Sequence, residues 1–177
     1  GMVSRTVYDQ GGVALGAANL SGNNFTGGQI GVFNRTGDNF TGLQAGVANW
    51  TKGEIKGFQV GPFNYAAHDV FGYQGSGGSL VSIARGKVMG VQESVFNWVG
   101  KDFFGMQAAL VNVVSGKAHG LQFAGINWVR GDLAGLQFGG INCVWQKRVD
   151  PQQAGKYSGS AGCHLQIGGI NYARSVI

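Results

Sequence analysis

Carboxylate side chains recur at nearly the same place in a fifteen-residue pattern along this chain, and they are the first residues whose spacing suggests chemistry. They are Asp38, Glu54, Asp69, Asp102 and Asp132, with Lys52 and Lys56 close by in the sequence. Paired carboxylates on one face cleave glycosidic bonds or hold a cation. A solvated turn edge produces the same pattern, so both interpretations stay open for this row.

Aromatic side chains form a second recurring set, one that suits stacking on sugar rings if it faces outward and core packing if it faces inward. Its members are Trp50, Tyr65, Trp98, Trp128 and Tyr172. Glu93 is a separate candidate, because it falls where equivalent residues are mostly apolar and has the hydroxyls of Ser76, Ser79 and Ser94 nearby in the sequence. A buried charge is costly unless it is compensated. The alternative for Glu93 is simple access to water or to backbone amides.

The two cysteines, Cys143 and Cys163, bracket a polar segment. A disulfide between them would close a loop of about 20 residues and stabilise the fold by up to roughly 3 kcal/mol. Two buried thiols are the alternative. The three histidines lie far apart in the chain, and no zinc or Walker motif is present. We therefore expect no metal, no cofactor and no catalytic residues.

These candidates are positioned by a repeat. Position 1 is usually Gly, position 3 is Gln, position 8 is Asn and position 9 is often aromatic, whereas charge gathers at positions 11 to 15. Two insertions, near 75–79 and 150–163, interrupt an otherwise regular series that we interpret as one domain over residues 1–177. The repeats begin near residues 12, 27, 42, 57, 72, 90, 105, 120, 135 and 164.

Fifteen residues are too few for a helix-turn-helix repeat, so the pattern predicts an all-β fold. Neighbouring repeats are equivalent, which favours a parallel β-solenoid of about ten coils. In such a fold, equal positions stack about 4.8 Å apart and the Gln and Asn side chains form amide ladders. We expect apolar residues at positions 2, 4, 7, 10 and 14 to fill the interior. An antiparallel β-meander or barrel built from the same repeats is the alternative.

The composition agrees with frequent turns, because the 177 residues include 34 Gly and only 2 Pro. The formal net charge of +5 is modest, and the Lys and Arg residues are scattered rather than clustered. Nucleic-acid binding usually requires a basic cluster. We therefore expect no nucleic-acid partner.

The motif Gly-apolar-Gln-apolar-Gly-apolar-apolar-Asn, repeated in phase from Gly12 to Asn171, resembles the bacterial surface repeat-containing proteins. That resemblance implies an exported or cell-surface location, with the leader outside this sequence, and no characterised activity. We expect a noncatalytic surface or structural protein that acts as an interaction scaffold. Cell-envelope polysaccharide or another protein would be its partner, and the solenoid ends would allow self-association. A carbohydrate-binding or carbohydrate-cleaving β-helix is the alternative.

Overall fold

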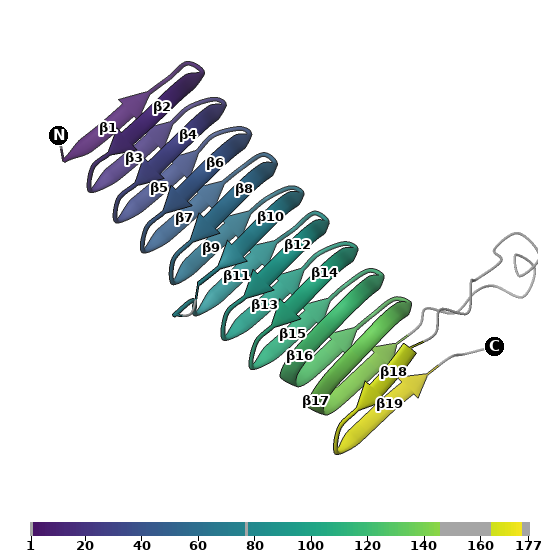
Figure 1. The fold of residues 1–177 in the computed structure, drawn as a ribbon. Helices are drawn as coiled ribbons and strands as arrows, with labels where there is room; N and C mark the ends of the chain where they lie inside the picture. The colour runs from purple at the N-terminus through teal and green to yellow at the C-terminus, as the bar shows by residue number, and fades with distance from the viewer. Residues whose placement is uncertain (1, 77, 146–163, 175–177) are drawn as a thin grey trace, which may run out of the picture.

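The computed structural model describes residues 2–76, 78–145 and 164–174, and all of its regular elements are β-strands. The chain winds as a regular coil along one axis (Figure 1). The strands are β1 (Val3–Thr6), β2 (Gln10–Leu15), β3 (Ala18–Ser21), β4 (Phe25–Ile30), β5 (Phe33–Thr36), β6 (Phe40–Ala45), β7 (Ala48–Thr51), β8 (Ile55–Val60), β9 (Phe63–Ala66), β10 (Val70–Gly75), β11 (Val81–Ala84), β12 (Val88–Glu93), β13 (Phe96–Val99), β14 (Phe103–Ala108), β15 (Val111–Val114), β16 (Ala118–Val129), β17 (Leu133–Trp145), β18 (His164–Ile167) and β19 (Ile170–Arg174).

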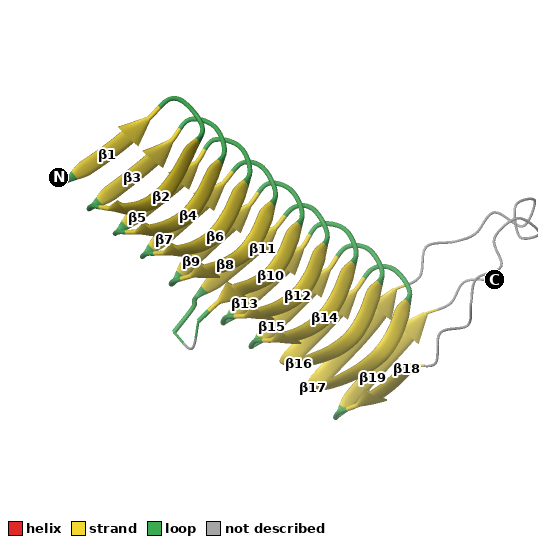
Figure 2. Cartoon of the chain, turned by 45° about the horizontal axis from the view of Figure 1, so that its top comes forward, coloured by secondary structure: helices red, strands yellow, loops and turns green. Residues whose placement is uncertain are grey.

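Each strand pairs in parallel with the equivalent strand of the next coil, so the parallel β-solenoid is confirmed and the antiparallel meander is wrong. Gln44 lies beside Gln59 in the β6–β8 pair, and Trp50 lies beside Tyr65 in the β7–β9 pair. The coil has two faces (Figure 2). The long face contains the six-residue strands, at positions 14 to 4, and the short face contains the four-residue strands, at positions 7 to 10.

Side chains alternate along each strand, and this alternation decides the interior. Positions 14 and 3 point inward on the long face, as do positions 8 and 10 on the short face, where Phe40, Gln44, Asn49 and Thr51 are all buried. Positions 2, 4 and 7 point outward. The expectation that these three positions fill the core is wrong, because they neighbour inward-facing amides and successive side chains of a strand point to opposite sides.

Two amide ladders run through the interior. In the first, each Gln Nε2 donates to Oε1 of the preceding coil's Gln at 2.7 to 2.8 Å, without a break from Gln29 to Gln166. In the second, each Asn Nδ2 donates to Oδ1 of the following coil's Asn at 2.8 to 3.0 Å. The two ladders therefore run in opposite directions, and the predicted stacking of Gln and Asn is confirmed.

The Asn ladder is interrupted once, where Ser82 occupies the Asn position. There Asn64 Nδ2 lies 3.3 Å from Ser79 Oγ, and in the next coil Ser94 Oγ donates to Asn97 Oδ1 at 2.6 Å. Serine hydroxyls at the corner thus replace the missing amide. The ladder begins at Asn19, whose Oδ1 is buried without a hydrogen-bond partner. Because each Asn amide donates to the following coil, the oxygen of the first Asn in the ladder has no preceding Asn to donate to it.

The apolar core is narrow and lies beside the turn at positions 11 to 13. Position 14 supplies its larger residues, including Phe25 and Phe40, whose rings stack with centroids 5.8 Å apart. Position 1 needs glycine, because Gly42 has φ +128° and a Cβ there would lie 2.0 Å from the carbonyl oxygen of Gly27. A side chain at this position would push the coils apart.

None of the described residues belongs to a helix of the length and apolarity required to cross a membrane.

We predict that Gln107→Leu destabilises the fold by about 2 kcal/mol or more, because it leaves Gln92 Oε1 and Gln122 Nε2 unpaired in the interior. The matched control is Met106→Leu, which places the same side chain one residue away, on the outside of the same strand. Urea denaturation followed by far-ultraviolet circular dichroism compares the two midpoints. Equal midpoints would contradict the structural role of the ladder.

Candidate functional site

The aromatic row at position 9 faces outward on the short face, so it is not core. Trp50, Trp128 and Tyr172 expose 43%, 40% and 44% of their surface, whereas Tyr65 and Trp98 are half-buried. Only Trp50 and Tyr65 lie in successive coils, with ring centroids 4.4 Å apart. Arg35, Ile83, Val113 and Cys143 occupy the row elsewhere. The row is therefore an interrupted set of aromatic side chains.

The remaining outward positions make both faces apolar, a feature that the sequence analysis missed. On the long face, Phe58 stands beside Tyr73 and Phe123 stacks on Phe138, with centroids 6.4 Å and 5.0 Å apart. At the corner opposite the charged turns, Leu110 is 63% exposed. The signal was present in the sequence, because an inward Gln at position 3 forces positions 2 and 4 outward.

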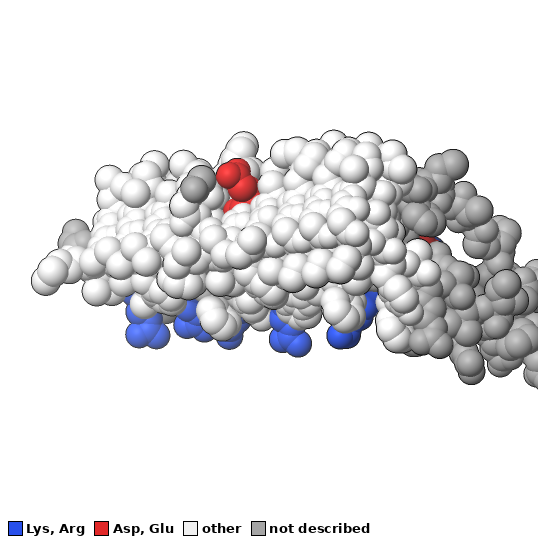
Figure 3. Space-filling view, turned by 90° about the horizontal axis from the view of Figure 1, so that it is seen from below, with Lys and Arg blue, Asp and Glu red and all other residues white. Residues whose placement is uncertain are grey.

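Charge is confined to one side of the cross-section. Among the side chains that the structure describes, every Lys, Arg, Asp and Glu except Glu93 lies at positions 9 to 15. Lys and Arg project along one side of the rod in Figure 3. We call positions 11 to 13 the charged edge. We call positions 5 and 6 the apolar edge, whose larger side chains are Val32, Val47, Pro62, Leu80, Val95 and Leu110.

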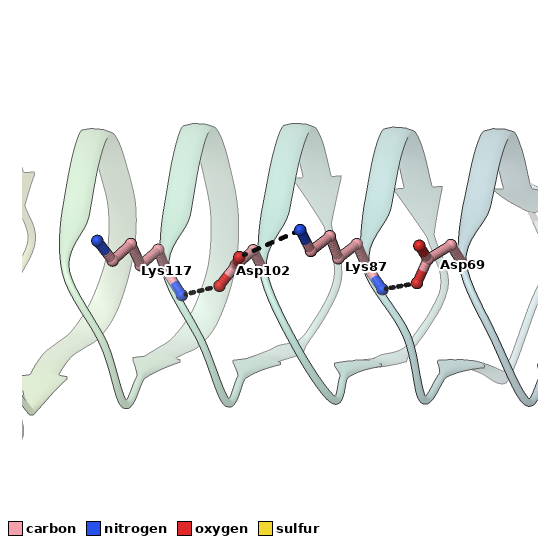
Figure 4. A network of polar contacts seen from close by, with 4 residues as sticks. All are labelled: Asp69, Lys87, Asp102 and Lys117. Atoms are coloured by element: carbon pink, nitrogen blue, oxygen red, sulfur yellow. Dashed lines mark hydrogen bonds and ion pairs between the residues drawn. The ribbon is translucent and has the colours of Figure 1, made fainter.

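The predicted acidic row exists only in part: Glu54 and Asp69 occupy position 13 of successive coils, with Asp38 at position 12 of the coil before them, and lysines interrupt the carboxylates beyond Asp69. Position 13 alternates in sign through Asp69, Lys87, Asp102 and Lys117 (Figure 4). Asp69 Oδ1 accepts a bond from the Lys87 backbone N–H at 2.7 Å, and Asp102 Oδ1 accepts one from the Lys117 N–H at 2.9 Å. Lys87 Nζ also lies 4.0 Å from Asp102 Oδ2.

Among the other members of that row, Asp132 also pairs with a lysine. Lys117 Nζ lies 3.4 Å from Asp132 Oδ2. Asp38 is displaced to position 12, and the backbone N–H of Glu54 donates to Asn39 Oδ1 at 2.8 Å. Asp69 and Asp102 therefore satisfy backbone N–H groups of the turn, and Asp102 and Asp132 pair with lysines. This arrangement explains the pattern without a pair of catalytic carboxylates.

Glu93 lies beside the first insertion, as its neighbours in the sequence indicated. A hollow of about 350 Å³ is lined by Ser76, Ser79, Glu93 and Ser94, together with Val95 and the residues 108–110. Tyr73 Oη donates to Glu93 Oε2 at 3.0 Å. The hydroxyls of Ser79 and Ser94 bond to the corner backbone and the Asn ladder. The Glu93 carboxylate is therefore held by Tyr73.

A larger hollow, of about 530 Å³, opens beside the charged edge near β16 and β17. It is lined by Ser115, Trp128, Arg130 and Trp145. Trp128 belongs to the predicted aromatic row, whereas Trp145 and Arg130 lie at position 11 and were not singled out from the sequence. Two aromatic surfaces and a guanidinium thus face one space.

Cys143 is half-buried at position 9, between Trp128 and Tyr172 of the neighbouring coils. Its predicted disulfide partner, Cys163, lies outside the described residues, as does most of the second insertion. Within residues 2–76, 78–145 and 164–174, no three His, Cys, Asp or Glu side chains gather closely enough to hold a metal ion.

Burial, the hydrogen bond to Glu93 and the charge of Glu93 raise the pKa of Tyr73 from 10.0 to about 12. We predict that Glu93→Gln lowers the pKa of Tyr73 but leaves it above 10, because burial is the largest cause and remains. Ultraviolet titration of tyrosinate, with Tyr73→Phe to identify its contribution, measures the change. Glu54→Gln on the charged edge serves as the control and leaves the curve unchanged. An equal pKa in wild type and Glu93→Gln would contradict the contact.

Comparison with known proteins finds no family model, no curated protein and no solved structure that matches this chain.

Proposed function

We propose that this chain is a noncatalytic interaction scaffold at a bacterial cell surface, and that it binds through its apolar outer faces. The observation that carries the proposal is the inversion of polarity. Gln and Asn occupy the half of the interior that lies away from the narrow apolar core, whereas Leu43, Phe58 and Leu110 stand outside. The surface location is supported by the resemblance of the repeat to bacterial surface repeat-containing proteins.

The size of the apolar surface supports this function. A strand rise of about 3.3 Å and a coil spacing of about 4.8 Å give a long face of roughly 20 Å by 40 Å. Its outward rows at positions 2 and 4 are almost entirely apolar, whereas the outward row at position 15 mixes Phe71, Met89 and Phe104 with Thr26, Thr41, Lys56 and His119. Soluble monomers rarely expose contiguous apolar patches above a few hundred Å². Larger patches are typical of surfaces that are covered by a partner.

The fold can carry such an apolar surface because contacts in the interior stabilise it. Backbone and amide bonds between coils, such as Gln59 Nε2 to Gln44 Oε1 at 2.7 Å, and the narrow apolar core link the coils from within. The outer positions are therefore free to serve binding. Their identity affects association more than stability.

We predict that replacing Leu43, Met106 and Leu121 with Ser weakens both self-association of the protein and its binding of an apolar dye. These three side chains supply exposed apolar area on the long face. Sedimentation velocity and binding of an apolar fluorescent dye measure the loss, and we expect the dye signal to fall at least twofold. Circular dichroism and the urea midpoint stay near those of wild type. The control replaces Lys52, Arg85 and Lys101 on the charged edge with Ser. A triple Leu43, Met106 and Leu121 variant that binds dye and associates like wild type contradicts the proposal.

Carbohydrate binding is a second candidate function, favoured by the hollow at Trp128, Trp145, Arg130 and Ser115. Aromatic rings stack on sugar rings, and the Arg130 guanidinium supplies donors for a carboxylated sugar. The interleaved lysines at position 13 favour binding over cleavage, because glycoside hydrolysis uses two carboxylates that face the scissile bond.

We predict that, if this hollow binds sugar, Trp128→Ala weakens binding of an acidic oligosaccharide, such as an oligouronate, at least tenfold. Isothermal titration calorimetry measures the affinity, and Trp50→Ala in the same row, away from the hollow, is the matched control. Absence of heat with wild type, or equal loss in both variants, removes this candidate.

A further inference from the structure

The two edges of the solenoid differ so sharply that they identify a partner for the apolar faces. Resting on the proposed function, we infer that the partner is one leaflet of a lipid bilayer. The rod enters edge-on, with the apolar edge among the acyl chains and the charged edge at the headgroups.

The first argument is the distribution of charge. Positions 1 to 8 carry no described charged side chain apart from Glu93, whereas the charged edge carries residues such as Lys52, Lys101 and Lys117. Lys and Arg lie along one side over the length of the rod (Figure 3). A chain buried in lipid keeps such groups at the interface, where water and phosphate solvate them.

The second argument is the backbone at the apolar edge. Polar backbone groups within lipid must be satisfied internally. Here the N–H groups of Val32, Leu80 and Leu110 each donate to a carbonyl of the preceding coil at 2.8 to 3.0 Å. The Asn ladder caps further corner carbonyls, as when Asn64 Nδ2 donates to Gly61 O at 2.7 Å. The apolar edge therefore places few unpaired polar groups in the acyl chains.

The third argument is the aromatic row. Trp and Tyr are enriched where acyl chains meet headgroups. The row at position 9 lies between the apolar edge and the charged edge, about three residues or 10 Å from position 6. One leaflet contributes about 15 Å of hydrocarbon. Insertion to the depth of this row therefore places Trp50, Trp98 and Trp128 near the interface and keeps the rod within one leaflet.

A second copy of the chain fits these observations less well. Packing of two long faces would cover Phe58 and Leu121, yet it would leave the short face and Leu110 of the apolar edge in water. A leaflet covers both faces and the apolar edge together. The lipid partner also gives the single charged edge a place at the headgroups.

Glu93 is the one described charge on the apolar side, at position 4 beside the apolar edge. Its bond from Tyr73 Oη offsets part of the cost of moving it out of water. Removing its charge in Glu93→Gln is expected to strengthen binding to vesicles severalfold.

The test uses the full chain with Cys143 and Cys163 replaced by Ser and one new cysteine carrying an environment-sensitive fluorophore. Leu110→Cys places the probe on the apolar edge, and Lys101→Cys places it on the charged edge. Flotation with phosphatidylcholine vesicles, with and without 30% phosphatidylglycerol, reports binding. We expect the protein to float, and the emission at position 110 to shift to the blue and rise at least twofold. The fluorophore at position 101 should keep the emission that it has in water.

Charge variants test the orientation. Val95→Lys with Leu110→Lys is expected to lower vesicle partitioning at least tenfold, because it places two ammonium groups among the acyl chains. The matched control adds the same charge to the charged edge through Asn23→Lys with His68→Lys, both at exposed positions, and retains binding. Circular dichroism confirms that both variants are folded. Equal loss in both pairs, or equal emission changes at positions 101 and 110, overturns the edge-on arrangement.

The outcomes separate this inference from the proposed function. A chain that does not float, forms dimers without lipid and shields position 110 in those dimers overturns the lipid partner but retains binding through apolar faces. A monomer that neither floats nor binds an apolar dye overturns both.

Discussion

The hydrogen bond between equivalent amides of successive coils is the constraint on which the rest of the structure depends. A Gln side chain reaches its counterpart only when coils stack in parallel, in register and about 4.8 Å apart. Each internal Gln is both donor and acceptor, so the loss of one leaves two neighbours unsatisfied in the interior. This explains why position 3 is Gln without interruption from Gln29 to Gln137. It also explains why position 1 is glycine, because a larger residue would separate the coils.

The outside of the molecule follows from this interior. Once Gln44 and Asn49 point inward, strand alternation turns positions 2, 4, 7 and 9 outward, and these are the positions that carry Leu, Phe and Trp. The turn at positions 11 to 13 is stabilised differently, by side chains such as Asp69 and Asp102 that accept backbone N–H groups of the next coil. Apolar and charged surfaces are therefore separated along the whole rod. That separation is the feature on which the proposed function rests.

The parallel stack, the amide ladders and the surroundings of Glu93 could be predicted from the sequence, because the repeat and its insertion fix which residues are equivalent. The fifteen-residue period, with Gln at position 3 and Asn at position 8, predicted the parallel stack and the amide ladders. The insertion placed Glu93 near Ser79 and Ser94, and the structure brings these residues around one hollow. The alternation of charge beyond Asp69 was missed because the sequence analysis considered the carboxylates alone, and Lys87 and Lys117 lie between Asp69, Asp102 and Asp132 only once the coils are stacked.

The sequence by itself determined the period and the residues that recur at equal positions, and it favoured parallel strands because neighbouring repeats are equivalent; the strand pairing of the structure excluded the antiparallel alternative. Only the tertiary structure decided which side of each strand faces the interior. Hydrophobicity alone assigned Leu43 and Phe58 to the core, whereas the paired amides occupy it. The physical reason is that an amide is costly to bury alone but is stable inside when amides of the coils above and below hydrogen-bond to it. The sequence of a single repeat does not show those neighbouring amides.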